Sequence, residues 1–175
     1  MGSNRFATTA LFMTILASTT HCTARSADRS DATVASNKAV VRRWIEEGFN
    51  HARPKVVDEL FAERVAVNGQ AVDRETLKQN MARHLAGFPD LHVHIDEIAA
   101  EGNKVGIWYT VEGTHQGDFE GVRPTDHRVT WVGSDLFTIE QGKIVEARFL
   151  SDLHGLLTQL GATVSPRPAV GPPRP

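Results

Sequence analysis

Residues 91–111, LHVHIDEIAAEGNKVGIWYTV, decide the fold, because the hydrophobic pattern of this stretch repeats every second residue. Such alternation is typical of strands that bury one face. The hydrophobic members are Leu91, Val93, Ile95, Val105, Ile107, Tyr109 and Val111. Gly102-Asn103 lies between the two runs and is a hairpin turn signal. The stretch therefore predicts two long antiparallel strands.

Helices are predicted before this hairpin and further strands after it. The predicted helices cover residues 36–50, begin again at Pro54, and run from the cap Asp73 to about Phe88. A brief strand is expected around residues 65–67. Two further strands cover residues 129–139 and 143–151, and a last helix covers 153–160 before Gly161. Helices followed by a strand meander predict an α+β domain, whose curved antiparallel sheet packs on the N-terminal helices around one cavity.

Composition limits the classes of function. The chain has 175 residues, of which 41% are hydrophobic, enough for one domain with a buried core. The net charge is -2, and Lys and Arg form no run. This argues against nucleic-acid binding and against a polybasic membrane surface.

The N-terminal 24 residues predict a secretion signal. Arg5 precedes a mostly apolar stretch, residues 7–17, which is about half the ~20 residues needed to span a membrane. We expect cleavage near residue 24, a secreted or periplasmic protein, and no stable membrane span in the mature form. The alternative is an uncleaved, unstructured N-terminus. Cys22, the only cysteine, lies in this segment, so the mature domain is expected to have no disulfide.

The remaining boundaries follow from composition. Residues 25–35 are rich in Ser, Asp, Thr and Ala without periodicity, which predicts a linker. The domain is expected over residues 36–161. A Pro-rich tail follows at residues 162–175, where an extended or disordered chain is expected.

Four segments carry a resemblance to a known family. They are VVRRWIEEGFN with VVDELFAERV, FPDLHVHIDEIAAEGNKV, GTHQGDFEGVRPTDHRV, and IEQGKIVEARFLSDLHGLLTQLG. In this order, between Asn37 and Gly161, the chain resembles the SnoaL-like polyketide cyclase (ester cyclase) family of the nuclear transport factor two-like superfamily. The resemblance implies a cone-shaped, cystatin-like α+β barrel with an interior cavity, and commonly a homodimer.

The resemblance also implies a chemistry. Family members close a polyketide ring by an intramolecular aldol reaction without metal or cofactor, and an aspartate near the end of the last strand serves as acid and base. The matching residue is Asp152. Arg148 stands where the family usually has a tryptophan, four residues earlier. This departure changes the chemistry expected of the pocket.

Strand alternation places Glu146, Arg148 and Asp152 on one face. If Asp152 faces the cavity, the other two do as well. Asp152 would then be the base, Arg148 would stabilise an enolate oxygen, and Glu146 would contact the substrate. The alternative is an internal ion-pair network that completes the polar end of the sheet.

Two further polar residues are candidates. His115, within GTHQG, could donate to a carbonyl or share a proton with Asp152, or it could be a loop histidine bonded to backbone. Tyr109 could line the cavity and bind substrate, or be a core residue whose hydroxyl reaches the rim. Trp44 and Phe88 are predicted as core or cavity wall and as substrate contacts.

His92, His94 and Asp96 show the spacing of metal ligands on one strand face. A zinc site needs further ligands, which no spacing predicts. We therefore expect no metal here and a solvated or dimer-facing surface.

Three functions remain open. The leading hypothesis is a cyclase- or isomerase-type lyase, independent of cofactors, that acts on a small hydrophobic carbonyl compound. The second is an epoxide-hydrolase-like enzyme in which Asp152 and Arg148 position a water. The third is a non-catalytic secreted or periplasmic protein that binds an apolar ligand.

Overall fold

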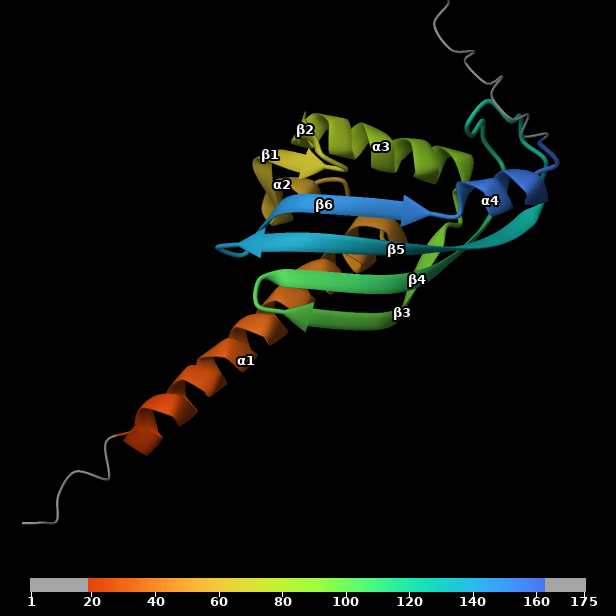
Figure 1. Cartoon of the computed structure of the whole chain (residues 1–175). Coiled ribbons are helices and arrows are strands. Elements are labelled where there is room, and N and C mark those ends of the chain that lie inside the picture. Colours follow the sequence, from red (N-terminus) through yellow and green to blue (C-terminus); the bar gives the residue numbers. More distant parts are fainter. Residues whose placement is uncertain (1–18, 163–175) are drawn as a thin grey trace, which may run out of the picture.

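The computed structural model describes residues 19–162 and places helices against one face of a single sheet (Figure 1). The chain begins with helix α1, Thr19–Arg43, which continues directly into a π-helical segment η1, Trp44–Asn50. The remaining helices are α2 (Val56–Leu60), α3 (Arg74–Gly87) and α4 (Leu153–Gln159). In Figure 1 the outer part of α1 extends away from the sheet.

The sheet has six strands in the order β2-β1-β6-β5-β4-β3. Their bounds are β1 Phe61–Val67, β2 Gln70–Asp73, β3 His92–Glu101, β4 Lys104–Thr114, β5 Arg128–Glu140 and β6 Lys143–Ser151. Only the β1–β6 pair is parallel. The α+β class predicted from the sequence is confirmed, with the four long strands close to their expected positions.

Local sequence explains most boundaries. Gly102 between β3 and β4, and Gln141-Gly142 between β5 and β6, have positive φ angles, as tight hairpins need. Asp73 caps α3, because its carboxylate accepts a hydrogen bond of 2.8 Å from the Thr76 N–H. The sequence did not predict β2, a strand of four residues that is too short to show a period of its own. The Asn68-Gly69 turn pairs it with β1.

The first helix begins earlier than the sequence predicted. Residues 25–35 are helical and belong to α1, which already begins at Thr19 rather than at Ser36. This segment contains neither Gly nor Pro and includes several alanines, so nothing in it breaks a helix. Most of the predicted signal peptide and nearly all of the Pro-rich tail lie outside the described residues. Within residues 19–162, no helix is both long and apolar enough to span a membrane.

The core lies between the helices and the inner face of the sheet. The predicted alternation holds, since Val93, Val105, Ile107 and Val111 are buried while His92 and His94 are exposed. On the helical side, Trp44, Ile45 and Met81 complete the same core. Gly48 is required beside Trp44, because an added Cβ would lie 2.9 Å from the indole ring.

Candidate functional site

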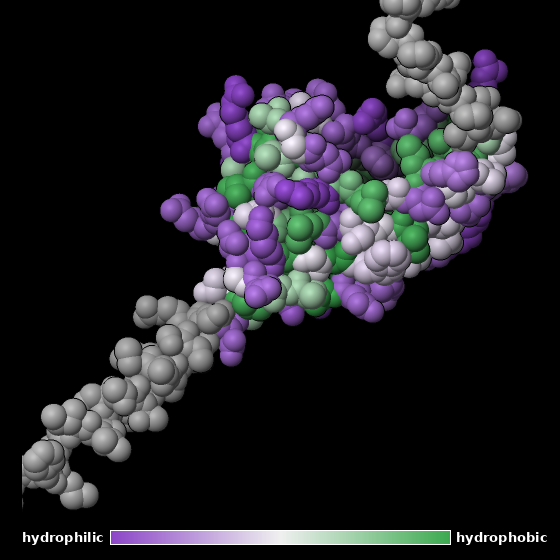
Figure 2. Space-filling model, in the orientation of Figure 1, coloured by the Kyte–Doolittle hydropathy of each residue, from purple (hydrophilic) through white to green (hydrophobic). Residues whose placement is uncertain are grey.

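A cavity of about 320 Å³ lies between the inner face of the sheet and the helices. Its volume falls at the lower end of the range for small-molecule sites. The walls are mainly aromatic and aliphatic: Trp44, Ile45, Phe49, Leu77, Met81, Leu91, Val93, Val111, Trp131 and Phe149. Figure 2 shows the surface hollowed between α3 and the region of α4, at the β6 end of the fold. The cavity therefore suits a compact, largely hydrophobic ligand.

One carboxylate, that of Asp135 on β5, faces this cavity. The residue is only 6% exposed. Its Oδ1 accepts a hydrogen bond of 3.2 Å from the Tyr109 hydroxyl and a longer one, 3.4 Å, from the Leu150 N–H. Burial raises the pKa of Asp135 to about 7, and these two hydrogen bonds only partly oppose the shift. Both the protonated and the ionised form of this carboxyl group are therefore accessible near neutral pH.

Tyr109 reaches Asp135 because the residue opposite it has no side chain. Tyr109 on β4 pairs directly with Gly133 on β5. A Cβ at Gly133 would lie 2.3 Å from both Cζ and the hydroxyl oxygen of Tyr109, so the ring occupies that space. Burial, and then the charge of Asp135, raise the pKa of the Tyr109 phenol well above its usual value. Tyr109 therefore stays protonated and donates to Asp135.

Two asparagines hold backbone at the cavity rim. Asn50, the last residue of η1, exchanges two hydrogen bonds with the backbone of Val93, at 2.8 and 3.0 Å. Asn68 does the same with Phe149, at 2.9 and 3.3 Å. Both Val93 and Phe149 line the cavity, so these side chains continue strand pairing where no neighbouring strand is present.

A polar row from α3 forms another part of the cavity wall. Asn80, Arg83 and His84 all line it, at the i, i+3 and i+4 spacing that places them on one helix face. The His84 Nδ1 lies 2.8 Å from the Asn80 carbonyl oxygen, so Nδ1 carries the proton in that bond. The imidazole packs edge-on against Phe49 and Phe119. Its Nε2 is thus the free nitrogen of the ring.

The structure corrects the face on which the predicted acid/base group lies. The inner face of β6 carries Ala147, which is buried, and Phe149 and Ser151, which line the cavity. Glu146 and Arg148 have the opposite parity and lie on the outer face of the sheet, whereas Asp152 follows the end of β6 and is not among the residues that line the cavity. Glu146 and Arg148 do share a face, and they form an ion pair of 3.1 Å.

Asp152 is exposed and caps α4, since its Oδ1 accepts a 2.8 Å hydrogen bond from the Gly155 N–H. Hydrogen bonds from Thr138, Lys104 and Arg148 lower the pKa of Glu146. Glu146 and Arg148 therefore belong to an ion-pair network with Lys104 on the outer face, and Asp152 is not part of it.

The other candidates divide between the cavity and the core. Trp44 and Tyr109 line the cavity. Phe88 and His115 are fully buried against each other, with ring centroids 5.3 Å apart, and are not among the lining residues. His115 Nδ1 lies 3.1 Å from the Thr125 hydroxyl, and its Nε2 has no hydrogen-bond partner among residues 19–162. Phe88 belongs to the buried core, where its ring packs against that of Trp131 with centroids 5.2 Å apart.

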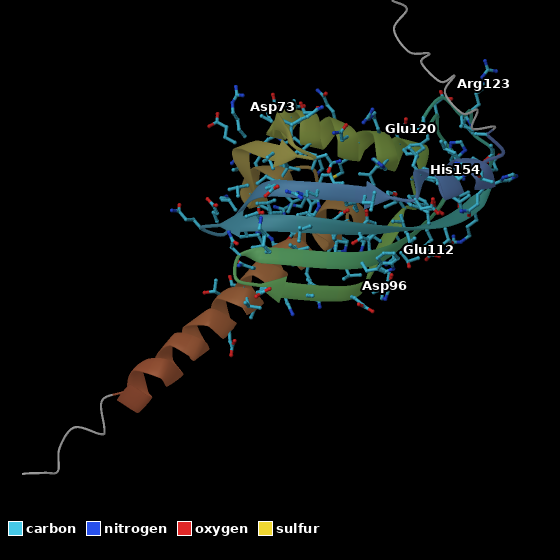
Figure 3. The ribbon with its side chains drawn as sticks, in the orientation of Figure 1. Asp73, Asp96, Glu112, Glu120, Arg123 and His154 are labelled. Atoms are coloured by element: carbon cyan, nitrogen blue, oxygen red, sulfur yellow. The ribbon has the colours of Figure 1, made fainter. Side chains whose placement is uncertain are left out.

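The outer strand face is solvated. His92 and His94 are exposed, and Asp96 accepts a 2.8 Å hydrogen bond from Thr110. Figure 3 shows Asp96 on β3 and Glu112 on β4, at the side of the sheet away from α3. Among residues 19–162, no three His, Cys, Asp or Glu side chains are grouped as a metal site would require.

Sequence reasoning missed Asp135, although the sequence contained a signal for it. The inward row of β5 runs Val129, Trp131, Gly133, Asp135 and Phe137. A single carboxylate in such an apolar row must be buried, and buried carboxylates are candidates for altered pKa values. The signal was the even spacing of Asp135 from Trp131 and Phe137, which places all three side chains on the same face of the strand.

The family model for SnoaL-like polyketide cyclases matches residues 39–160, well over half of the chain. The chain belongs to the SnoaL-like polyketide cyclase family. That range includes both the cavity and the closing helix α4. A search of curated protein sequences finds no match.

Solved structures of the SnoaL-like fold support this assignment. A candidate SnoaL-like polyketide cyclase from Jannaschia sp. CCS1 is 28% identical, with a TM-score of 0.68 over 75% of this chain and 96% of that one. AclR from Streptomyces galilaeus, a candidate hydroxylase, is also 28% identical, with a TM-score of 0.66 over 73% and 97%. IdmH from Streptomyces antibioticus, a candidate polyketide cyclase, is 25% identical, with a TM-score of 0.65 over 72% and 99%. These neighbours support a function of the cyclase or hydroxylase type.

Proposed function

We propose that this protein catalyses cofactor-independent acid/base chemistry on a small hydrophobic carbonyl compound, with Asp135 as the base. The reaction is an aldol-type cyclisation or an isomerisation. The observation that supports it best is the Asp135 carboxylate, which faces an apolar cavity and has a pKa raised to about 7. A base acts most effectively when its pKa lies near the working pH.

The proposed aldol steps need only this one carboxylate. Asp135 removes a proton from a carbon next to a carbonyl, and the resulting enolate carbon attacks a second carbonyl of the same molecule. The new alkoxide then takes the proton back from Asp135. A carbon–carbon bond forms, no electrons leave the substrate, and the base is regenerated. Tyr109 holds Oδ1, which leaves Oδ2 without a hydrogen bond from the described residues and available to the substrate.

The family resemblance gives the base to Asp152, and the same substitution at both positions separates the two assignments. We propose to follow deuterium exchange next to the carbonyl of 2-tetralone, a bicyclic ketone that suits the cavity, by proton NMR in D₂O. Asp135→Asn should reduce protein-catalysed exchange by roughly 10²- to 10⁴-fold, as expected for loss of a general base. Asp152→Asn keeps a capping oxygen and should exchange at the parent rate.

Two outcomes would contradict the proposal. If Asp152→Asn abolishes exchange while Asp135→Asn does not, the base is Asp152, as the resemblance implies. If the parent protein binds 2-tetralone without accelerating exchange, the protein is better described as a non-catalytic binder of apolar ligands.

We also propose that two copies associate through the outer face of the sheet. Trp108 on β4 and Leu150 on β6 are 49% and 70% exposed, and both pair with Ser134 on β5. Leu136, two residues further along β5, is 39% exposed. In the view of Figure 2, hydrophobic surface lies between hydrophilic residues over this face. Apolar residues gathered across three strands are typical of an interaction surface.

Light scattering after size-exclusion chromatography tests this association. The parent should have the mass of a dimer, and Leu150→Asp should have that of a monomer. Leu153→Asp is the matched control, because Leu153 is also exposed but lies on α4 rather than on the sheet. A monomeric parent would disprove the association.

Export remains a separate proposal that rests on the N-terminal sequence. We propose cleavage between about residues 24 and 28, which would release the protein to the periplasm or the medium. N-terminal sequencing of the exported protein tests it, and an intact Met1 on cytosolic protein would contradict it.

A further inference from the structure

The cavity carries a cation without an acidic partner. Arg83 is the only lysine or arginine among the described residues that line it. The single hydrogen bond of its guanidinium joins Nη2 to Asn80 Oδ1, and the described residues place no carboxylate within ion-pair distance. Several other cations do form ion pairs with carboxylates: Arg43, Arg53, Lys78, Lys104, Arg128 and Arg148.

The α3 row holds this cation at the cavity. Asn80 accepts from Arg83 through its side chain and from His84 through its backbone carbonyl. Asn80 therefore orients both neighbours, and all three residues line the cavity. A planar guanidinium held by one nitrogen retains other N–H donors for a ligand. Carboxylates match that donor geometry, because two parallel hydrogen bonds can form.

The charge balance of the cavity favours an anion. Asp135 is the only carboxylate among the described residues that line the cavity, and burial disfavours its charged form. The charge of Arg83 is therefore not fully cancelled within the cavity. Apolar walls strengthen the attraction between this cation and an anionic group, compared with open water. A neutral ligand of the same shape would gain less from it.

We propose that the ligand of this cavity is a hydrophobic ring compound that carries a carboxylate, which Arg83 binds at the α3 side. This inference deepens the proposed function, on which it rests, by naming the class of substrate. The ring lies against the aromatic walls, and the carboxylate lies at the polar row. Arg83 thus selects acids over their neutral analogues and takes no part in the proton transfer assigned to Asp135.

Isothermal titration calorimetry with 2-naphthoate and 2-naphthamide tests the selection. The two probes share shape and ring system, and at pH 7 only the first is charged. The parent should bind 2-naphthoate about five- to tenfold more tightly, a modest factor because Arg83 is exposed. The preference should shrink as salt is added, because ions screen an exposed charge. Arg83→Gln should abolish it, chiefly by weakening the binding of 2-naphthoate.

Two further variants complete the design. Arg123→Gln removes the same charge from an exposed residue that does not line the cavity, and it should keep the preference. In Figure 3 Arg123 points away from the body of the fold. Asp135→Asn should also keep the preference for the acid, even though it abolishes exchange of 2-tetralone. Failure of the proposed base and failure of the proposed selection are therefore distinguishable.

The inference is overturned by any of three results. The parent binds acid and amide equally, Arg83→Gln retains the preference, or Arg123→Gln removes it as fully as Arg83→Gln does. Absence of measurable binding of either compound to the parent also overturns it, because a cavity for hydrophobic carboxylates has to accept so compact a probe.

Discussion

Two aspartates on neighbouring strands have opposite environments. Asp135 on β5 points into the cavity, where it is 6% exposed and where burial raises its pKa to about 7. Asp152, directly after β6, is exposed and caps α4 through the Gly155 N–H. Ionisation of the Asp135 carboxyl group lowers the stability of the fold. The Asp152 carboxylate instead accepts a hydrogen bond from a backbone N–H at the start of α4 that would otherwise lack a partner.

The difference teaches that position in a strand pattern does not by itself identify the reactive group. Both residues lie near the pairing between β5 and β6. Asp135 pairs with Phe149, and Asp152, one residue after β6, donates its backbone N–H to the Val132 carbonyl oxygen. What separates them is burial, because Asp135 lines the cavity whereas Asp152 lies beyond the end of β6 and is exposed. An enzyme accepts a cost in stability at a buried ionisable group when that group is used, so the cost itself marks Asp135 as a candidate.

The largest expected effect on stability is at Asp135. Asp135→Asn should raise the free energy of unfolding at pH 8 by roughly 2 to 4 kcal/mol, because the parent has to hold a buried charge there and the amide does not. The folded-state pKa is raised above that of the unfolded chain, so the parent loses stability as pH rises from about 4 to about 7. Urea unfolding at pH 8 and pH 4.5 measures the difference.

The pH dependence provides the control for that prediction. At pH 4.5 the parent carboxyl is protonated in the folded state but still partly ionised in the unfolded chain, so the advantage of the asparagine variant should shrink to about a quarter. A gain of equal size at both pH values would mean that packing, and not ionisation, sets the difference. No gain at pH 8 would mean that the Asp135 carboxylate is not costly to ionise.

A second prediction concerns the residue that makes room for Tyr109. Gly133→Ala should destabilise the fold by about 1 to 3 kcal/mol, as overpacking does, because its Cβ would lie 2.3 Å from the phenol. The displaced Tyr109 should also lose its bond to Asp135. Gly106→Ala on β4 is the matched control, since its Cβ would meet neighbours only at 3.9 Å or beyond. Equal stability of the two variants would show that Tyr109 moves without cost.

The sequence predicted the architecture better than the site. Alternation at residues 91–111 placed β3, β4 and their turn correctly, because period-two burial is a local property of a strand. Residues 25–35 were less clear, since Ser, Thr, Asp and Ala occur both in linkers and in helices. The extra length of α1 was therefore missed.

The face of β6 was not predictable from its own residues. Its inner row includes Ala147, Phe149 and Ser151, and its outer row includes Arg148 and Leu150, so hydrophobic side chains occur in both. Pairing with β5 decides the matter, because Phe149 lies opposite Asp135 and shares its face. On β5 the hydrophobic side chains gather in a single alternating row, so the buried face can be read from the sequence. The position of Asp135 in that row could therefore have identified it.

A third, smaller effect is expected in the pH profile. Tyr109→Phe removes a hydrogen bond that lowers the pKa of Asp135, so that pKa should rise above about 7 by roughly half a unit to one unit. The base acts when ionised, so the exchange rate of 2-tetralone rises with pH through this pKa, and the midpoint should move to higher pH. Rates measured between pH 5.5 and 9 give the midpoint. An unchanged midpoint with a lower plateau would instead give Tyr109 a direct role in binding the ketone.

The smallest effect is expected at Asp152, where the comparison between the two aspartates is easiest to break. Asp152→Ala removes the acceptor for the Gly155 N–H and should lower the free energy of unfolding by about 1 kcal/mol, the usual cost of losing a helix cap. Asp152→Asn should cost only a few tenths, because an amide oxygen can also accept that bond. Asp73→Ala at the start of α3 is the control and should destabilise in the same direction, since Asp73 makes the same kind of cap with Thr76.

If both Asp152 variants exchange 2-tetralone at the parent rate, the carboxylate acts only as a cap. Loss of exchange in Asp152→Ala at temperatures where it remains folded would require the carboxylate to reach the cavity, and the separation of the two environments would then be wrong.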